Sequence, residues 1–188
     1  MMTRVKETVQ SLEARRSVIW LFFIAAGIFV PAGFHRLGLG VAFLPMHIPV
    51  FIGAFLCGPY MGMAGAVCTV VLSCLMTGMP PVFPTGVCMM AELAAYAGVC
   101  AGIMKNRSYT MPSLYGALIA GIVAGRLVNG IAGALTAGIV GESYSLSAFV
   151  EGSVISTIPG TILLLCVVPG LVMLLESVLG FHKRGSGE

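Results

Sequence analysis

The chain has 188 residues, of which 58% are hydrophobic and only 9% are charged, and its mean hydropathy is +1.02. A soluble domain carries about a quarter charged residues, so this composition excludes an ordinary soluble protein. The net charge of +3 comes from a few basic clusters and does not require a nucleic-acid partner. The composition therefore predicts an integral membrane protein.

The basic residues set the predicted topology, because eight of the ten lysines and arginines fall in three clusters. One cluster precedes the first apolar run, one interrupts the chain near its middle, and one follows the last run. The clusters consist of Arg4, Lys6, Arg15 and Arg16, then Lys105 and Arg107, and finally Lys183 and Arg184. Cytoplasmic loops collect Lys and Arg, so each interval should hold an even number of spans and both termini should be cytoplasmic.

A membrane-spanning helix needs roughly 20 mostly apolar residues, and the sequence offers six candidates. In chain order, the expected spans are 17–34, 47–57, 60–77, 85–104, 112–140 and 147–175. Four of them precede the middle basic cluster and two follow it, so each interval holds an even number of spans, as the basic clusters require. The second is the shortest and suits a tilted or interrupted segment.

The sequence thus predicts an all-α integral membrane protein built as a bundle of six transmembrane helices. A cytoplasmic or interfacial segment (1–16) precedes the membrane domain (17–176), and a cytoplasmic tail (177–188) follows it. The third span should stop at the proline-rich loop 78–84, because proline cannot continue a helix.

Ionisable groups inside apolar spans are costly and usually functional, so they are the candidate site residues. Glu92 and Tyr96 share one face of the fourth expected span, and Arg126 and Asn129 share one face of the fifth. Two further candidates lie near the outer ends of spans, and they are His47 and Glu151. All six fall in the outer half of the bundle if the topology holds. The pattern predicts a polar pocket that opens outside and is closed below by apolar packing.

Structural alternatives remain open for these residues. Glu92 and Arg126 could form an ion pair that fixes helix register without touching any ligand. His47 could cap a helix start, and Glu151 could be solvated at the membrane surface.

Motifs typical of enzymes and metal sites do not occur. The six cysteines stand singly in apolar segments, without a C-x-x-C pair, and there is no P-loop, H-E-x-x-H or G-x-S-x-G motif. We therefore expect no catalytic residues, no metal site, no cofactor and no enzymatic activity.

Four local patterns point to a known family. They are LPMHIPV at 44–50 with GPYMG at 58–62, TGMPPVFP at 77–84, MAELAAY at 90–96 and GRLVNG at 125–130. With six spans in under 200 residues, the sequence resembles the substrate-binding S components of energy-coupling factor (ECF) vitamin transporters, from about residue 17 to 176. One departure concerns an A-x-x-x-A pair on the first helix, which many members carry for docking. Here Phe29 and Val30 follow Ala25 and Ala26 by four residues.

The resemblance implies a high-affinity binder of a vitamin or cofactor precursor in the cell membrane. Its partners would be a transmembrane T component and two cytoplasmic ATPase subunits. On this reading Glu92, Tyr96, Arg126 and Asn129 contact the ligand, with His47 and Glu151 as further contacts. The loop residues that would act as a lid are Pro80, Pro81 and Phe83.

Two other function classes are considered. A self-sufficient secondary carrier would use Glu92 as a proton-coupling carboxylate, although the chain lacks an inverted repeat. A small membrane enzyme or assembly factor is disfavoured by the missing catalytic motifs. The substrate also stays open, because Arg126 could meet a carboxylate, whereas two outer-half carboxylates would favour a ligand with an amine or ring N–H.

Overall fold

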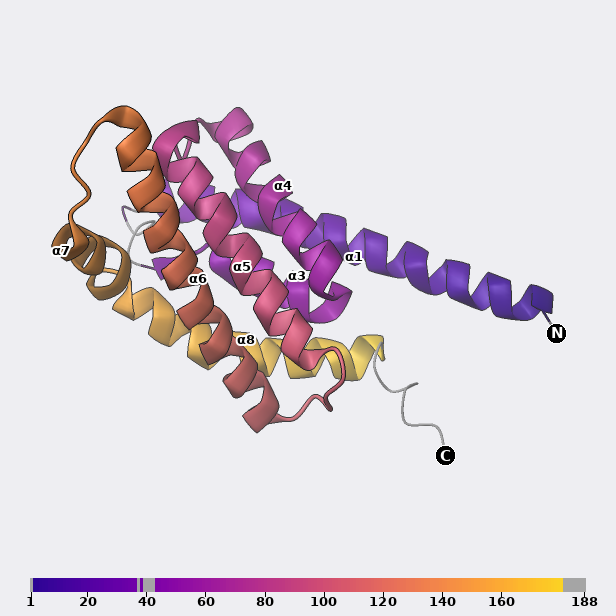
Figure 1. Cartoon of the computed structure of the whole chain (residues 1–188). Coiled ribbons are helices and arrows are strands. Elements are labelled where there is room, and N and C mark those ends of the chain that lie inside the picture. The colour runs from indigo at the N-terminus through magenta and orange to yellow at the C-terminus, as the bar shows by residue number, and fades with distance from the viewer. Residues whose placement is uncertain (1, 37, 39–42, 181–188) are drawn as a thin grey trace.

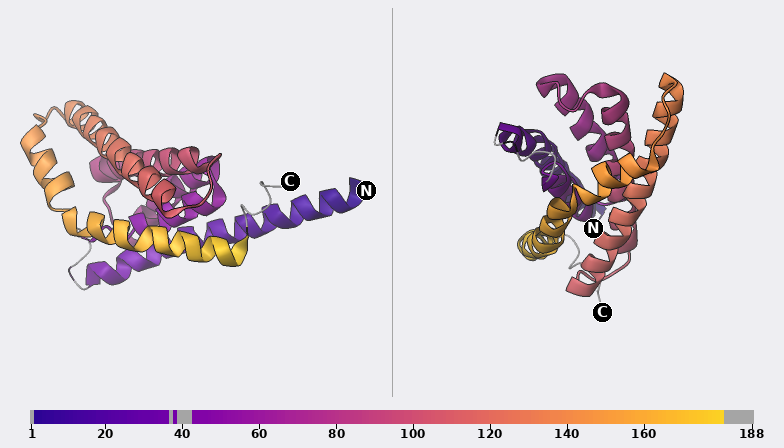
Figure 2. Two further views of the ribbon diagram at one scale, coloured as in Figure 1. Left: turned by 90° about the horizontal axis from the view of Figure 1, so that it is seen from below. Right: turned by 90° about the vertical axis from the view of Figure 1, so that its left-hand side faces the viewer.

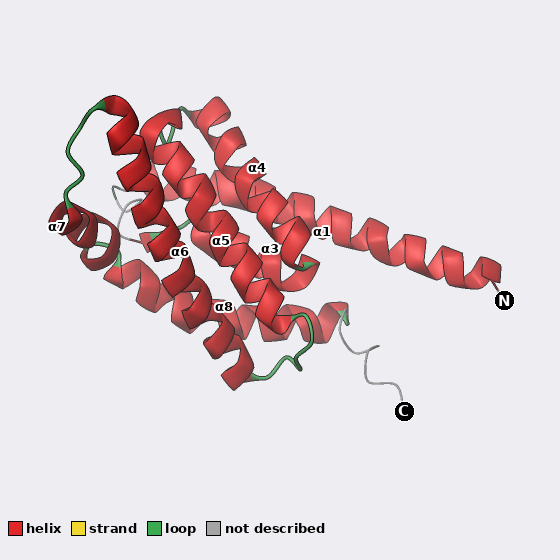
Figure 3. Cartoon of the chain, viewed as in Figure 1, coloured by secondary structure: helices red, strands yellow, loops and turns green. Residues whose placement is uncertain are grey.

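The computed structural model describes residues 2–36, 38 and 43–180, and these form helices joined by loops, without a strand (Figure 3). The elements are α1 (Met2–Arg36), α3 (His47–Cys57), α4 (Pro59–Thr77), α5 (Val87–Met104), α6 (Met111–Val140), α7 (Leu146–Phe149) and α8 (Ile158–Leu179), with π-helical turns η1 (Val82–Gly86) and η2 (Val150–Ile155). The predicted all-α membrane bundle is confirmed. Five segments are long and apolar enough to span a membrane, and α3 is a shorter apolar helix.

Helix α1 is longer than the predicted first span. Its span-like part is Glu13–Phe34, and its N-terminal part extends beyond the bundle (Figure 1). The predicted loop after it and the predicted tail lie partly outside the described residues.

Helix α3 is short because protein, not lipid, surrounds it. Its 11 residues reach about 17 Å at the usual helical rise, against about 30 Å of hydrocarbon. Ten of the 11 are buried, and the helix packs against α1, α4, α5 and α8. The expectation of a short or interrupted second span is thereby met.

The predicted sixth span is broken. Instead of one helix over 147–175, the chain forms α7 and η2, then bends sharply before α8 (Figure 2). Pro159 is in the first turn of α8, where its missing N–H costs nothing. The break therefore precedes Pro159, whereas Pro169, the other proline of the expected span, lies inside α8.

Two contacts bring the N-terminal and middle basic clusters to one end of the bundle. The Cys57 thiol donates to the Arg16 carbonyl at 3.7 Å, and the Tyr109 hydroxyl donates to the Phe55 carbonyl at 2.6 Å. Burial raises the pKa of Tyr109, so its hydroxyl stays a donor. The charge rule predicts that this end is cytoplasmic.

Helices α5 and α6 approach closely where Gly125 faces the ring of Tyr96. A Cβ atom at Gly125 would lie 2.9 Å from Tyr96 Cζ and nearer still to two other ring carbons. Only glycine fits this contact without displacing the aromatic ring, and the contact holds α5 and α6 in register.

Gly125→Ala is expected to destabilise the protein by about 1–3 kcal/mol through overpacking. Gly138→Ala is the matched control, because no atom lies within 4 Å of a Cβ at that position of the same helix. Thermal unfolding of both variants in detergent tests this. Equal melting temperatures for the two variants would contradict the proposed tight contact.

Candidate functional site

A cavity of about 670 Å³ lies at the end of the bundle opposite the basic clusters. Its lining comes from several parts of the chain, namely the C-terminal part of α1, the start of α3, the end of α4 with its following loop, α5, α6 and the η2–α8 junction. Of the residues predicted from the sequence, six line it, namely His47, Pro80, Pro81, Glu92, Arg126 and Asn129. The fold therefore collects most of the candidate polar groups around one space.

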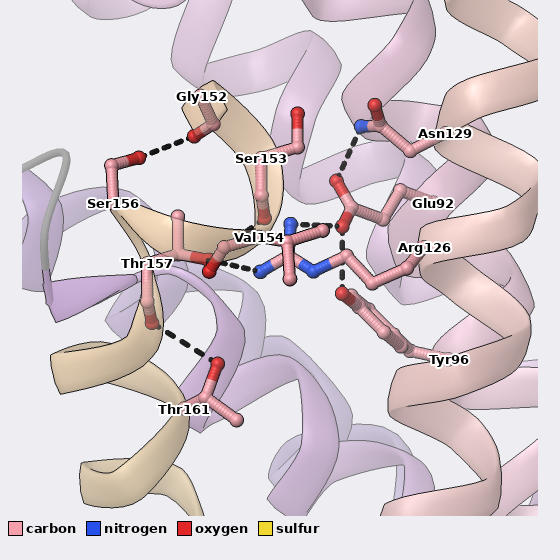
Figure 4. Close-up of polar contacts among 10 residues, drawn as sticks. All are labelled: Glu92, Tyr96, Arg126, Asn129, Gly152, Ser153, Val154, Ser156, Thr157 and Thr161. Carbon is pink, nitrogen blue, oxygen red and sulfur yellow. Dashed lines mark hydrogen bonds and ion pairs between the residues drawn. The ribbon is translucent and has the colours of Figure 1, made fainter. Parts of the chain in front are cut away.

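Glu92 is the centre of a polar network in the cavity floor (Figure 4). Its Oε1 accepts hydrogen bonds from the Tyr96 hydroxyl at 2.6 Å and from Arg126 Nη1 at 2.8 Å. Its Oε2 accepts from Asn129 Nδ2 at 2.6 Å. The side chain of Glu92 is only 4% exposed, so these three donors replace the water that a carboxylate would otherwise bind.

Arg126 joins α6 to the start of α8. Its Nη2 donates to Thr157 Oγ1 at 2.9 Å, while the Thr157 hydroxyl donates in turn to the Ser153 carbonyl at 2.8 Å (Figure 4). The guanidinium is thus held between a carboxylate and a hydroxyl that belong to different helices. This arrangement fixes the direction of its planar group of donors.

Tyr96 lies behind the cavity floor and contacts Glu92 from the protein interior. It is 1% exposed and does not line the cavity; its ring lies 5.4 Å from that of His47 and 5.0 Å from that of Phe51. The structure therefore places Tyr96 as a residue that orients Glu92, not as a wall of the cavity. His47 does line the cavity, and it is 3% exposed.

Two predicted site residues lie away from the lining. Glu151 is exposed on η2, although its neighbours Gly152 and Ser153 line the cavity. Phe83 is 44% exposed and outside the lining, whereas Pro80 and Pro81 belong to it. The loop is tied to α4 through the Ser73 hydroxyl, which donates to the Met79 carbonyl at 2.8 Å.

Several lining residues were not predicted from the sequence. Thr157 carries no charge and lies inside the apolar span expected over 147–175, so no sequence signal singles it out. Met89 precedes Glu92 by three residues and shares its helical face, which is a signal that could have identified it. Within the described residues, no group of three or more His, Cys, Asp or Glu could hold a metal ion.

The geometry of the polar network suits the binding of a small molecule. A buried ion pair costs desolvation energy that its own attraction repays only when further hydrogen bonds satisfy both partners. Here Tyr96, Asn129 and Thr157 supply those bonds. The result is a rigid polar floor beneath a cavity, suited to holding a small molecule in one orientation.

Comparison with known proteins agrees with this architecture. The family model for the ECF transporter substrate-specific component matches residues 17–179, which include every element from the membrane part of α1 to the end of α8. No curated protein and no solved structure gives a significant match. This family is defined by substrate binding for transport and not by catalysis. The chain belongs to the family of ECF transporter substrate-specific components.

Proposed function

We propose that this protein is a high-affinity, multi-pass binding subunit of the cell membrane that captures a vitamin or cofactor precursor from outside. The observation that carries the proposal is the cavity of about 670 Å³ with the Glu92–Arg126 pair in its floor. Ligand pockets of proteins usually measure about 300–1,000 Å³, so a vitamin-sized molecule fits. The cavity lies away from the basic cytoplasmic end, which supports capture from the outer side.

Release to the inside requires partners on this proposal. Below the floor the bundle is filled by fully buried apolar side chains, including Phe55, Leu118, Leu164 and Val168. Among the described residues, this layer gives the ligand no polar route straight through the packed helices. Membership of the family supports a T component and two cytoplasmic ATPases as the machinery that moves the loaded subunit and opens it inwards.

The proline-rich loop after α4 acts as a lid in this scheme. Pro81→Ala is expected to raise the ligand release rate several-fold, because the loop loses a residue of fixed backbone angle that lines the cavity. Stopped-flow measurement of ligand release is the test. Pro112→Ala is the control, since Pro112 begins α6 at the opposite end. Equal release rates from the wild type and the Pro81 variant would contradict the lid role.

Native mass spectrometry of the detergent-purified chain tests the proposed function directly. A stoichiometric adduct of vitamin size is expected, either carried through purification or acquired from a pooled vitamin and nucleobase panel. A folded protein that remains empty after this incubation contradicts the binding-subunit proposal. So does proton-driven uptake by the chain alone in vesicles, which would indicate a secondary carrier.

A further inference from the structure

The charges in the cavity floor cancel. Among the described lining residues, Glu92 and Arg126 carry the full charges, and their closest atoms are 2.8 Å apart. His47 is the one further titratable residue among the described residues that line the cavity. A ligand with a net charge would therefore bring an unbalanced charge into a largely buried site, and that is costly in a low-dielectric environment.

The same floor still has hydrogen-bonding capacity of both kinds. A guanidinium has five N–H donors, and Arg126 gives two of them to described residues, one to Glu92 and one to Thr157. Glu92 Oε1 accepts two hydrogen bonds, but Oε2 accepts only the one from Asn129. The floor can therefore donate to a ligand through Arg126 and accept from it through Glu92.

His47 is the second, independent indication of a ligand. It is 3% exposed and lines the cavity, and neither ring nitrogen has a hydrogen-bond partner among the described residues. A neutral imidazole carries one donor and one acceptor, and leaving them unpaired when buried costs free energy. Both nitrogens are themselves buried, so a ligand in the cavity can pair with them only when the ring turns towards it.

The wall contributed by α1, the end of α4 and the loops is mostly apolar, although Ser73, Thr77 and Thr85 also line the cavity. It includes Pro31 from α1, Met46 before α3 and Met79 and Pro80 from the loop after α4, with Met89 of α5 beside them. Methionine side chains adapt to flat or irregular apolar surfaces. The cavity therefore combines a polar floor with an adaptable apolar wall.

We propose that the cavity selects a ligand without net charge that presents hydrogen-bond donors and acceptors along one edge and an apolar face to the remaining wall. An amide, lactam or hydroxyl-bearing heterocycle has this chemistry, whereas a carboxylate or an amine does not. Arg126 and Glu92 recognise the polar edge, and the His47 ring joins them when it turns into the cavity. The inference rests on the proposed binding function and narrows its substrate class.

Matched probe pairs test the selection. Nicotinamide and nicotinate, panthenol and pantothenate, and biotinamide and biotin differ within each pair mainly in one carboxylate charge. For each pair that binds, isothermal titration of the full chain in nanodiscs should give the uncharged member at least a tenfold higher affinity than the charged member. Tighter binding of a carboxylate member overturns the inference while leaving the proposed function intact. A co-purified molecule without net charge supports the inference, and a charged one overturns it. A protein that binds none of the probes and carries no co-purified molecule overturns both the inference and the proposed function.

Variants show whether charge balance is the cause. Glu92→Gln keeps the shape and an acceptor oxygen but leaves Arg126 uncompensated, so the carboxylate members should gain at least tenfold relative to their uncharged partners. An unchanged preference in folded Glu92→Gln protein overturns the inference.

Substitutions of His47 provide a measurement that does not depend on the folding of the Glu92 variant. His47→Phe should weaken the uncharged probe at least tenfold without lowering the melting temperature of the empty protein, since it removes unpaired buried groups. His47→Gln, which keeps a donor and an acceptor, should retain more of the affinity. If His47→Phe instead lowers that melting temperature and leaves affinity unchanged, His47 is structural and the inference fails.

Discussion

Replacement of Glu92 by alanine is expected to destabilise the folded protein by about 3–5 kcal/mol, which is the usual cost of leaving one partner of a buried ion pair alone. The substitution strands Arg126 and also removes the acceptor for the Tyr96 hydroxyl and the Asn129 amide. Equilibrium unfolding in bicelles would measure the change in the free energy of unfolding.

The double variant Glu92→Leu/Arg126→Met is the control for this prediction. Removing both charges together replaces the pair by apolar side chains of similar size, which is often close to neutral for stability. We expect the double variant to recover most of the stability that Glu92→Ala loses. A double variant as unstable as the single one would show that the lost packing, and not the stranded charge, is responsible.

Replacement of Arg126 by alanine is expected to weaken ligand binding by about 2 kcal/mol, or roughly 30-fold, because hydrogen bonds from a charged donor contribute about 1.5–3 kcal/mol. The relevant ligand is the molecule identified by mass spectrometry or the tightest uncharged probe. Titration of nanodisc-embedded protein gives the affinity directly.

Two further substitutions separate the charge of Arg126 from its orientation. Arg126→Lys keeps the charge but loses the planar group of donors, so it should recover only part of the affinity. Thr157→Val removes the hydroxyl that accepts from Arg126 Nη2 and should weaken binding less than Arg126→Ala. If the folded Arg126→Ala protein binds the ligand with unchanged affinity, the role of Arg126 is only to fix the register of the helices.

Much of the fold could be predicted because lipid imposes simple rules. Long apolar runs and the basic clusters define the number of helices, and the proline-rich stretch after α4 ends that helix as expected. The pairing of Glu92 with Arg126 follows from the cost of burying either charge alone, and the structure shows that pair at 2.8 Å. Its role in ligand binding stays a prediction.

The remaining features depend on tertiary context. The break before α8 is not visible in the hydropathy of 147–175, because a bent helix and a straight one are equally apolar. Thr157 gains importance only when that bend brings its hydroxyl to Arg126. The methionine part of the wall is equally hidden, since methionine in a membrane protein carries no distinctive signal until the fold places it at a cavity.

The apolar packing beneath the floor has a consequence for the cell as well as for the ligand. Within the part of the chain that the structure describes, Phe55, Leu118, Leu164 and Val168 are 0–1% exposed and offer no polar group to a passing proton or sodium ion. On the proposed function, a copy of this subunit that has no partner would not dissipate the electrochemical gradient. Vesicles that contain only this chain should therefore hold a potassium diffusion potential as long as protein-free vesicles do.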